Sequence, residues 1–351
     1  LDPDKHFLPA SPSGNHFNFC EAEVGKGFNH DVHGPWDYLG ESEHYRINNI
    51  NDSLFSSEIG CTAMPRLETL EKYSLGMPLW PPDESNYYYM HRGAWWIRLK
   101  QYTGLFGEFA ADGSQLADYV RASQYLQAES LAYSAQAARR RWPQRSGMII
   151  WMGNEPFPNS SNTSVIEYDG TPKPAYYKVK SAFAPVAVSA RYDKISWSSG
   201  ENFQSEIFLA SDNPSDMLDI KAQVFDARGN LLIEKEFNNS KTEPYVPVGQ
   251  VDFTLKSLPE KVFIMILSGT IADSAVCREE YVFTLDTSHP FEPIRKLPKA
   301  TLDVEYISEC VWKVRNTGEV AAVGAFAYAE QSGKTAPADN GFFCLMPSEK
   351  I

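Results

Sequence analysis

The pattern of hydrophobic and polar positions changes character near residue 185. Before this point, apolar side chains recur near helical spacing over residues 115–141, which predicts a helix with arginines in its last turn. Residues 148–151 (Met-Ile-Ile-Trp) predict a short, fully buried strand, and residues 173–183 predict a second amphipathic helix. Helix, buried strand, polar loop and helix form the alternation expected of a parallel barrel.

After residue 185 the pattern favours antiparallel β-structure. The segments are short, often alternate between apolar and polar residues, and are separated by turn sequences such as Asp-Ala-Arg-Gly-Asn at 226–230. We expect a β-sandwich over 185–288 and, after a Pro-containing linker, a second and incomplete sandwich over 289–351. The predicted strands are 187–191, 205–210, 219–226, 230–237, 251–256 and 261–268.

Residues 53–70 contain a candidate catalytic carboxylate. An apolar start at Leu54 and Phe55 runs into one carboxylate, Glu58, and the spacing of Leu67 and Leu70 then predicts a helix. A carboxylate at the end of a short strand, followed by a loop and a helix, is how a β/α barrel presents a catalytic group at its rim. The structural alternative is a Glu that caps the following helix or pairs with an arginine.

The amino-acid composition of the chain argues against some classes of function. The formal net charge is −13 and no basic run exceeds residues 139–141, so we expect no nucleic-acid partner, and no apolar run has the length of a membrane span. Aromatic residues make up 13% of the chain, which suits a sugar-binding cleft, although aromatic cores are the commoner use. The five cysteines lack metal-type spacing, so we expect neither a metal nor a cofactor. The chain starts at Leu1 without an initiator methionine, which predicts a fragment or a processed product.

Several stretches resemble glycoside hydrolase family 2, most closely its β-mannosidase-type members. Phe-Ser-Ser-Glu-Ile-Gly at 55–60 is similar to the nucleophile strand of that family, and His-Asp-Val-His-Gly-Pro-Trp at 30–36 to the preceding strand end. Residues 147–159 resemble the last barrel strand and 168–180 the final barrel helix. Residues 315–321 and 339–349 resemble the last sandwich domain.

The resemblance implies the C-terminal half of a (β/α)8 TIM barrel over 1–184, followed by immunoglobulin-like β-sandwich domains. It implies a retaining exo-β-glycosidase that removes terminal β-D-mannose, with Glu58 as nucleophile and the acid/base upstream of Leu1. The expected partners are the carbohydrate substrate and the missing N-terminal part of the same enzyme. β-Galactosidase, β-glucuronidase and exo-β-glucosaminidase activities remain open, as does a non-catalytic carbohydrate-binding relative.

The resemblance also implies substrate contacts, each with a structural alternative. Trp151 is expected in the sugar floor or as a core residue. His33 and Trp36 are expected to contact the sugar or to pack within their loop. Asn154 would bond hydroxyls or serve turn chemistry. Glu155 follows Glu58 by 97 residues (155 − 58), so we expect a substrate or wall contact, or a rim salt bridge, and not the acid. Tyr38 and His91 are weaker candidates.

Overall fold

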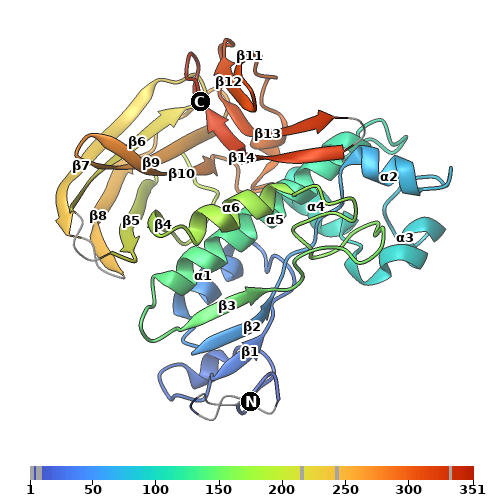
Figure 1. Cartoon of the computed structure of the whole chain (residues 1–351), viewed down its shortest axis with the longest axis horizontal. Coiled ribbons are helices and arrows are strands. Elements are labelled where there is room, and N and C mark those ends of the chain that lie inside the picture. Colours follow the sequence, from blue (N-terminus) through green and yellow to red (C-terminus); the bar gives the residue numbers. More distant parts are fainter. Residues whose placement is uncertain (1–3, 5–9, 214–216, 242–244, 332–333) are drawn as a thin grey trace.

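Three short parallel strands form the first sheet of the molecule. The computed structural model describes residue 4 and residues 10–213, 217–241, 245–331 and 334–351. Strands β1 (Asp31–His33), β2 (Phe55–Ile59) and β3 (Gly147–Ile150) lie in the order β1-β2-β3 (Figure 1). Both pairings are parallel, so the carboxyl ends of all three strands meet at one edge of the sheet.

Helices connect and cover these strands. The predicted long helix is confirmed as α5 (Leu116–Arg139), and the second one as α6 (Pro174–Ala182). Figure 1 shows the two helices side by side, between the parallel sheet and the C-terminal strands. Further helical elements of this part are η1 (Glu21–Glu23), α2 (Leu67–Tyr73), η2 (Ala94–Trp96) and α4 (Leu99–Phe106). No helix in the described ranges combines the length and apolar content that a membrane span requires.

Two helices of this part were not predicted, and one strand departs from its predicted burial. Residues 41–50 form α1 (Glu41–Ile50), whose buried face of His44, Tyr45 and Asn48 is too polar to show an apolar period. The aromatic stretch at 79–95 contains α3 (Tyr87–Gly93), which the Asn86 side chain caps by accepting from the Tyr88 N–H. Strand β3 is not fully buried: Ile149 is 52% exposed, since β3 pairs only with β2 within the described residues.

The predicted β-structure after residue 185 is confirmed as two facing antiparallel sheets. Their strands are β4 (Val186–Arg191), β5 (Asn202–Ser211) and β8 (Val246–Thr254) in one sheet, and β10 (Ser274–Thr284), β9 (Val262–Ile271), β6 (Met217–Asp226) and β7 (Leu231–Lys241) in the other. Phe203 of the first sheet lies 5.3 Å from Phe263 and 4.9 Å from Phe283 of the second, measured between ring centroids. Burial of these rings between the sheets forms the sandwich core.

The turn predicted between β6 and β7 is present, and one side chain closes it. Asp226 Oδ1 accepts hydrogen bonds from the backbone N–H groups of Arg228 and Asn230, and Gly229 adopts a φ of 81° that favours glycine. The following part of the chain is less regular. It contains α7 (Glu292–Arg295) and two separate hairpins, β11 (Leu302–Ser308) with β12 (Val311–Asn316) and β13 (Ala322–Gln331) with β14 (Lys334–Leu345).

A cluster of tyrosines joins the helices to the sandwich. The Tyr192 ring, just after β4, lies 5.1 Å from Tyr45 of α1, 4.7 Å from Tyr133 of α5 and 5.0 Å from Phe283 of β10. The hydroxyls of Tyr192 and Tyr45 both donate to Glu129 Oε1, at 2.7 and 3.1 Å. Burial raises the pKa of Glu129, because it disfavours the charged carboxylate. The hydrogen bonds from the two hydroxyls act in the opposite direction and stabilise the charged form.

Buried charges hold the loop after β3 to the loop after β2. Lys173 Nζ lies 3.0 Å from Glu155 Oε1 with both side chains fully buried, and it also donates to the carbonyl of Ala63 at 3.4 Å. Glu167 accepts from the backbone N–H of Arg66 at 2.7 Å. Because an unpaired buried charge is costly, these pairs fix the path of residues 154–173.

We expect Tyr192→Phe to lower the free energy of unfolding by about 1–3 kcal/mol, because Glu129 loses one of its hydroxyl donors. Urea unfolding of the full-length protein measures this. Tyr306→Phe is the matched control, since that residue is 58% exposed on β11. Equal losses in the two variants would contradict a structural role for the Tyr192 hydroxyl.

The Glu155–Lys173 pair gives a second stability prediction. Lys173→Met should destabilise the protein by about 3–5 kcal/mol, because it leaves the Glu155 carboxylate buried without its counter-charge. The double variant Lys173→Met, Glu155→Leu removes both charges and should recover much of that loss. Thermal and urea unfolding compare the two, and a double variant that is less stable than the single one would disprove the explanation.

Candidate functional site

The strand ends of the parallel sheet gather four of the predicted site residues. Glu58 lies at the end of β2, His33 ends β1, and Trp36 and Trp151 follow β1 and β3. Backbone hydrogen bonds set this arrangement: the Gly34 N–H donates to the Glu58 carbonyl at 2.7 Å, and the Trp151 N–H to the Ile59 carbonyl at 2.8 Å. The pairing of the strands therefore brings together residues more than a hundred positions apart in the sequence.

Glu58 is partly open and is held through one oxygen. Trp36 Nε1–H donates to its Oε2 at 3.2 Å, and His33 Nδ1 lies 3.7 Å from the same oxygen. The Glu58 side chain is 27% exposed, against 8% for His33. No hydrogen bond joins Oε1 to another described residue, so this oxygen is available to a ligand.

A network of small polar groups orients His33. Ser11 Oγ lies 2.9 Å from Asp31 Oδ2, 2.9 Å from His33 Nε2 and 2.7 Å from Ser57 Oγ. A carboxylate only accepts hydrogen bonds, so the single hydroxyl proton of Ser11 is directed to Asp31. Ser11 Oγ must then accept from Nε2–H of His33, which fixes the imidazole with Nδ1 facing Glu58.

Aromatic rings form a wall next to this carboxylate. The Trp151 ring lies 6.3 Å from Trp36 and 6.1 Å from Trp96, and Phe17 lies 4.9 Å from the His33 ring. The sequence reasoning did not single out Trp96 or Phe17. The aromatic density just before Trp96 was the available signal, but it does not say which ring turns toward Glu58.

Other predicted residues lie apart from this group. The Asn154 side chain is exposed, and its Nδ2–H₂ makes a long 3.5 Å contact to the Glu155 carbonyl. Glu155 is buried against Lys173, which favours the salt bridge that was its structural alternative. Tyr38 is a core residue, 4.8 Å from the His44 ring, and His91 is exposed and stacked on Tyr87.

Two further observations concern the surroundings. Arg98 forms a bidentate pair with Asp37, at 2.7 and 2.5 Å, which ties the loop after β1 to the start of α4 and was not foreseen. A cavity of about 360 Å³ between α2, α5 and the β13–β14 hairpin is lined by none of the residues around Glu58.

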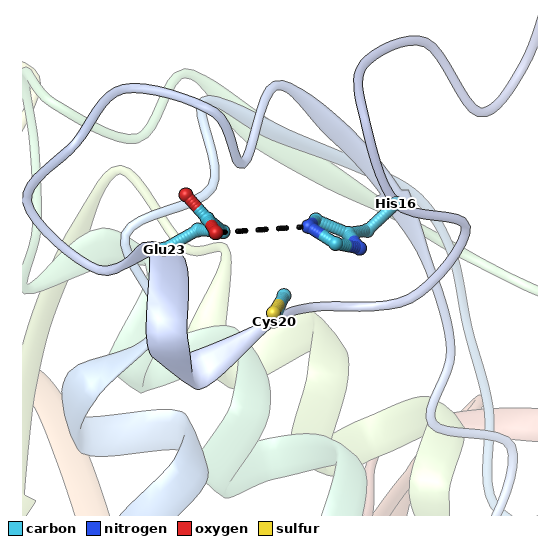
Figure 2. Close-up of side chains that lie close together, drawn as sticks. All are labelled: His16, Cys20 and Glu23. Atoms are coloured by element: carbon cyan, nitrogen blue, oxygen red, sulfur yellow. Dashed lines mark ion pairs between the residues drawn. The ribbon is translucent and has the colours of Figure 1, made fainter.

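No metal motif was expected from the cysteine spacing, yet the fold brings His16, Cys20 and Glu23 together (Figure 2).

Comparison with known proteins finds relatives of part of this chain. No protein-family model matches the chain. The chain is 30% identical over 200 residues to β-mannosidase B of Aspergillus niger and 27% identical over 200 residues to that of Emericella nidulans. Each match covers 56% of this chain and 23% of the relative, so the chain spans only about a quarter of the relatives' length.

Solved structures share the fold over more of the chain. The β-D-mannosidase of Dictyoglomus thermophilum superposes with a TM-score of 0.67 and 20% identity, covering 92% of this chain and 37% of that one. The exo-chitosanase of Amycolatopsis orientalis gives 0.64 and 17%, covering 91% and 42%. The resemblance predicted from the motifs is thereby confirmed: the chain is similar in sequence to proteins named β-mannosidase B, and it shares its fold with a β-D-mannosidase and an exo-chitosanase.

Proposed function

We propose that this chain is the C-terminal half of a retaining exo-β-glycosidase that releases terminal β-D-mannose, with Glu58 as the nucleophile. The observation that carries the proposal is the setting of Glu58. Its carboxylate stands at the carboxyl end of the central parallel strand, is held through Oε2 alone, and lies beside Trp36. The similarity to proteins named β-mannosidase supports the sugar.

The geometry fits the first step of double displacement. A retaining glycosidase needs an ionised carboxylate to attack the anomeric carbon, and no group among the described residues donates a hydrogen bond to Oε1 of Glu58. Trp36 donates to Oε2 at 3.2 Å, which stabilises the charged form and fixes the rotation of the carboxylate. His33 Nδ1 lies 3.7 Å from the same oxygen, beyond hydrogen-bond distance, so the ring packs beside Oε2 and leaves Oε1 clear.

We place the acid/base in a part of the full-length protein that this chain does not include. The mechanism requires a second carboxyl group about 5–5.5 Å from the nucleophile. Glu155 is the carboxylate that an Asn-Glu pair offers, and its burial against Lys173 argues against that role. The greater length of the relatives leaves room for the missing group.

The same proposal assigns the architecture. Residues 1–184 would be the later strands and helices of a (β/α)8 barrel, residues 185–288 a bracing sandwich, and 289–351 part of a further β domain. The exposure of Ile149 on β3 supports additional strands from the rest of the protein, because a pairing neighbour would cover this edge.

The aromatic wall supports a sugar ligand. Trp36 contacts Glu58, the Trp151 ring lies 6.3 Å from Trp36, and Trp96 extends the wall beyond Trp151. The C–H faces of a pyranose pack on such rings.

Aryl β-glycosides of mannose, galactose, glucuronic acid and glucosamine, tested side by side, separate the mannosidase proposal from the other activities of the family. No turnover of any of them would favour a non-catalytic carbohydrate-binding protein.

We expect Glu58→Gln in the full-length protein to abolish turnover and leave folding intact, because an amide cannot form the glycosyl–enzyme bond. Steady-state assays with aryl β-mannoside and circular dichroism measure both. Glu71→Gln, an exposed position on α2, is the control and should retain activity. Wild-type-like turnover by Glu58→Gln would rule out the assignment.

The Ser11 network predicts an effect on kcat. Ser11→Ala removes the acceptor for His33 Nε2–H, so the ring loses its orientation toward Glu58, and kcat should fall about 3- to 10-fold with little change in KM. Ser13→Ala, two residues away and bonded to Asp31 only through its backbone carbonyl, is the matched control. If both variants keep the same kcat, the network does not position the nucleophile.

A further inference from the structure

His16, Cys20 and Glu23 form a cluster of metal-ligating side chains outside the Glu58 site. His16 Nε2 lies 4.0 Å from Glu23 Oε1, and one ligand atom from each of the three residues lies within 4.8 Å of the others. In Figure 2 the side chain of Cys20 lies below the dashed line that joins the imidazole to the carboxylate. The three side chains come from the loop before η1 and from η1 itself.

The backbone around this cluster is held in place. Asn29, which is buried, accepts from the Cys20 N–H and donates to the Cys20 carbonyl, both at 3.1 Å. The Glu23 N–H donates to the same carbonyl at 3.1 Å, and Asn29 is itself fixed by donating to Asp52 at 2.8 Å. The backbone that carries the thiol and the carboxylate is therefore held by surrounding hydrogen bonds.

The side chains fit zinc in kind and spacing. Imidazole nitrogen, thiolate sulfur and carboxylate oxygen are its usual ligands, at about 2.0–2.3 Å from the ion, which puts ligand atoms about 3–4 Å apart. His16 is 41% exposed and can move by the roughly 1 Å that separates the longest ligand distance, 4.8 Å, from this spacing. The direct contacts of Glu23 are long, 4.0 Å to His16 and 3.9 Å to Lys26, so a cation between the groups displaces no strong bond.

We propose that His16, Cys20 and Glu23 bind one zinc ion, with water in the fourth position. Binding releases the thiol proton to solvent and leaves the zinc without redox change. The ion would secure the loop that carries Phe17, whose carbonyl accepts from the His33 N–H at 2.9 Å and whose ring packs on His33. This site is independent of the glycosidase proposal, because it shares no residue with it.

Titration of the metal-free, reduced full-length protein with Zn²⁺ and with Co²⁺ tests the site. Calorimetry should give one ion per chain, and the cobalt form should show a thiolate-to-cobalt charge-transfer band. Cys20→Ser should abolish that band, and both Cys20→Ser and His16→Ala should weaken binding at least about tenfold.

Cys310→Ser is the matched control, because Cys310 is an exposed free thiol on another part of the chain. It should leave the stoichiometry, the affinity and the band unchanged. Circular dichroism of the metal-free variants checks folding, and His16→Ala at an exposed position provides a second variant if Cys20→Ser is unstable. The absence of one-to-one binding, or a band that survives Cys20→Ser, would overturn the proposal.

Discussion

The parallel pairing of β2 with both of its neighbours is the constraint on which the rest of this site depends. It places Glu58 between the carboxyl ends of β1 and β3. It also brings the backbone just after β2 close to the loop that follows β3. A Cβ at Gly60 would lie 2.8 Å from the Trp151 carbonyl and 3.1 Å from Thr163 Cβ, so the close approach requires glycine. Any larger residue at this position would push the Trp151 loop away from Glu58.

Burial separates the roles of two carboxylates. Glu58 keeps part of its surface open, accepts a hydrogen bond from the Trp36 ring N–H at Oε2, and has the His33 ring beside that oxygen. Glu155 has no exposed side-chain surface and needs the ammonium of Lys173 beside it. The first arrangement suits chemistry, and the second fixes the loop that follows β3, so the same residue type serves the site in one place and the scaffold in the other.

The β-sandwich contacts the helices of the site region through a few aromatic rings and one buried carboxyl group. Tyr192 contacts α1, α5 and β10, and its hydroxyl reaches the carboxyl group of Glu129. Because α5 connects the β2 side of the sheet to β3, holding α5 against the sandwich also holds the distance between these strands. These contacts hold the β-domain against the helices beside the site, and the described residues around Glu58 all come from the part of the chain before residue 185.

The sequence by itself determined what depends on local periodicity. The helix α5, the strands after residue 185, the turn at Asp226 and the position of Glu58 at a strand end all follow from neighbouring residues along the chain. Helix α1 escaped prediction because tertiary contacts bury its polar face, against Tyr133 and the Ser130 carbonyl. Its apolar period is therefore weak.

Only the tertiary structure decided how the site residues meet. Ser11 and Ser57 are 46 positions apart, Trp36 and Trp151 more than twice that, and His16 reaches Cys20 and Glu23 through a loop without a regular repeat. Residue types suggest which groups can react, bind or pair. Strand pairing and burial decide which of these groups lie at one edge of a sheet, within hydrogen-bond distance or at the spacing of metal ligands. Both act between residues that no local sequence pattern relates.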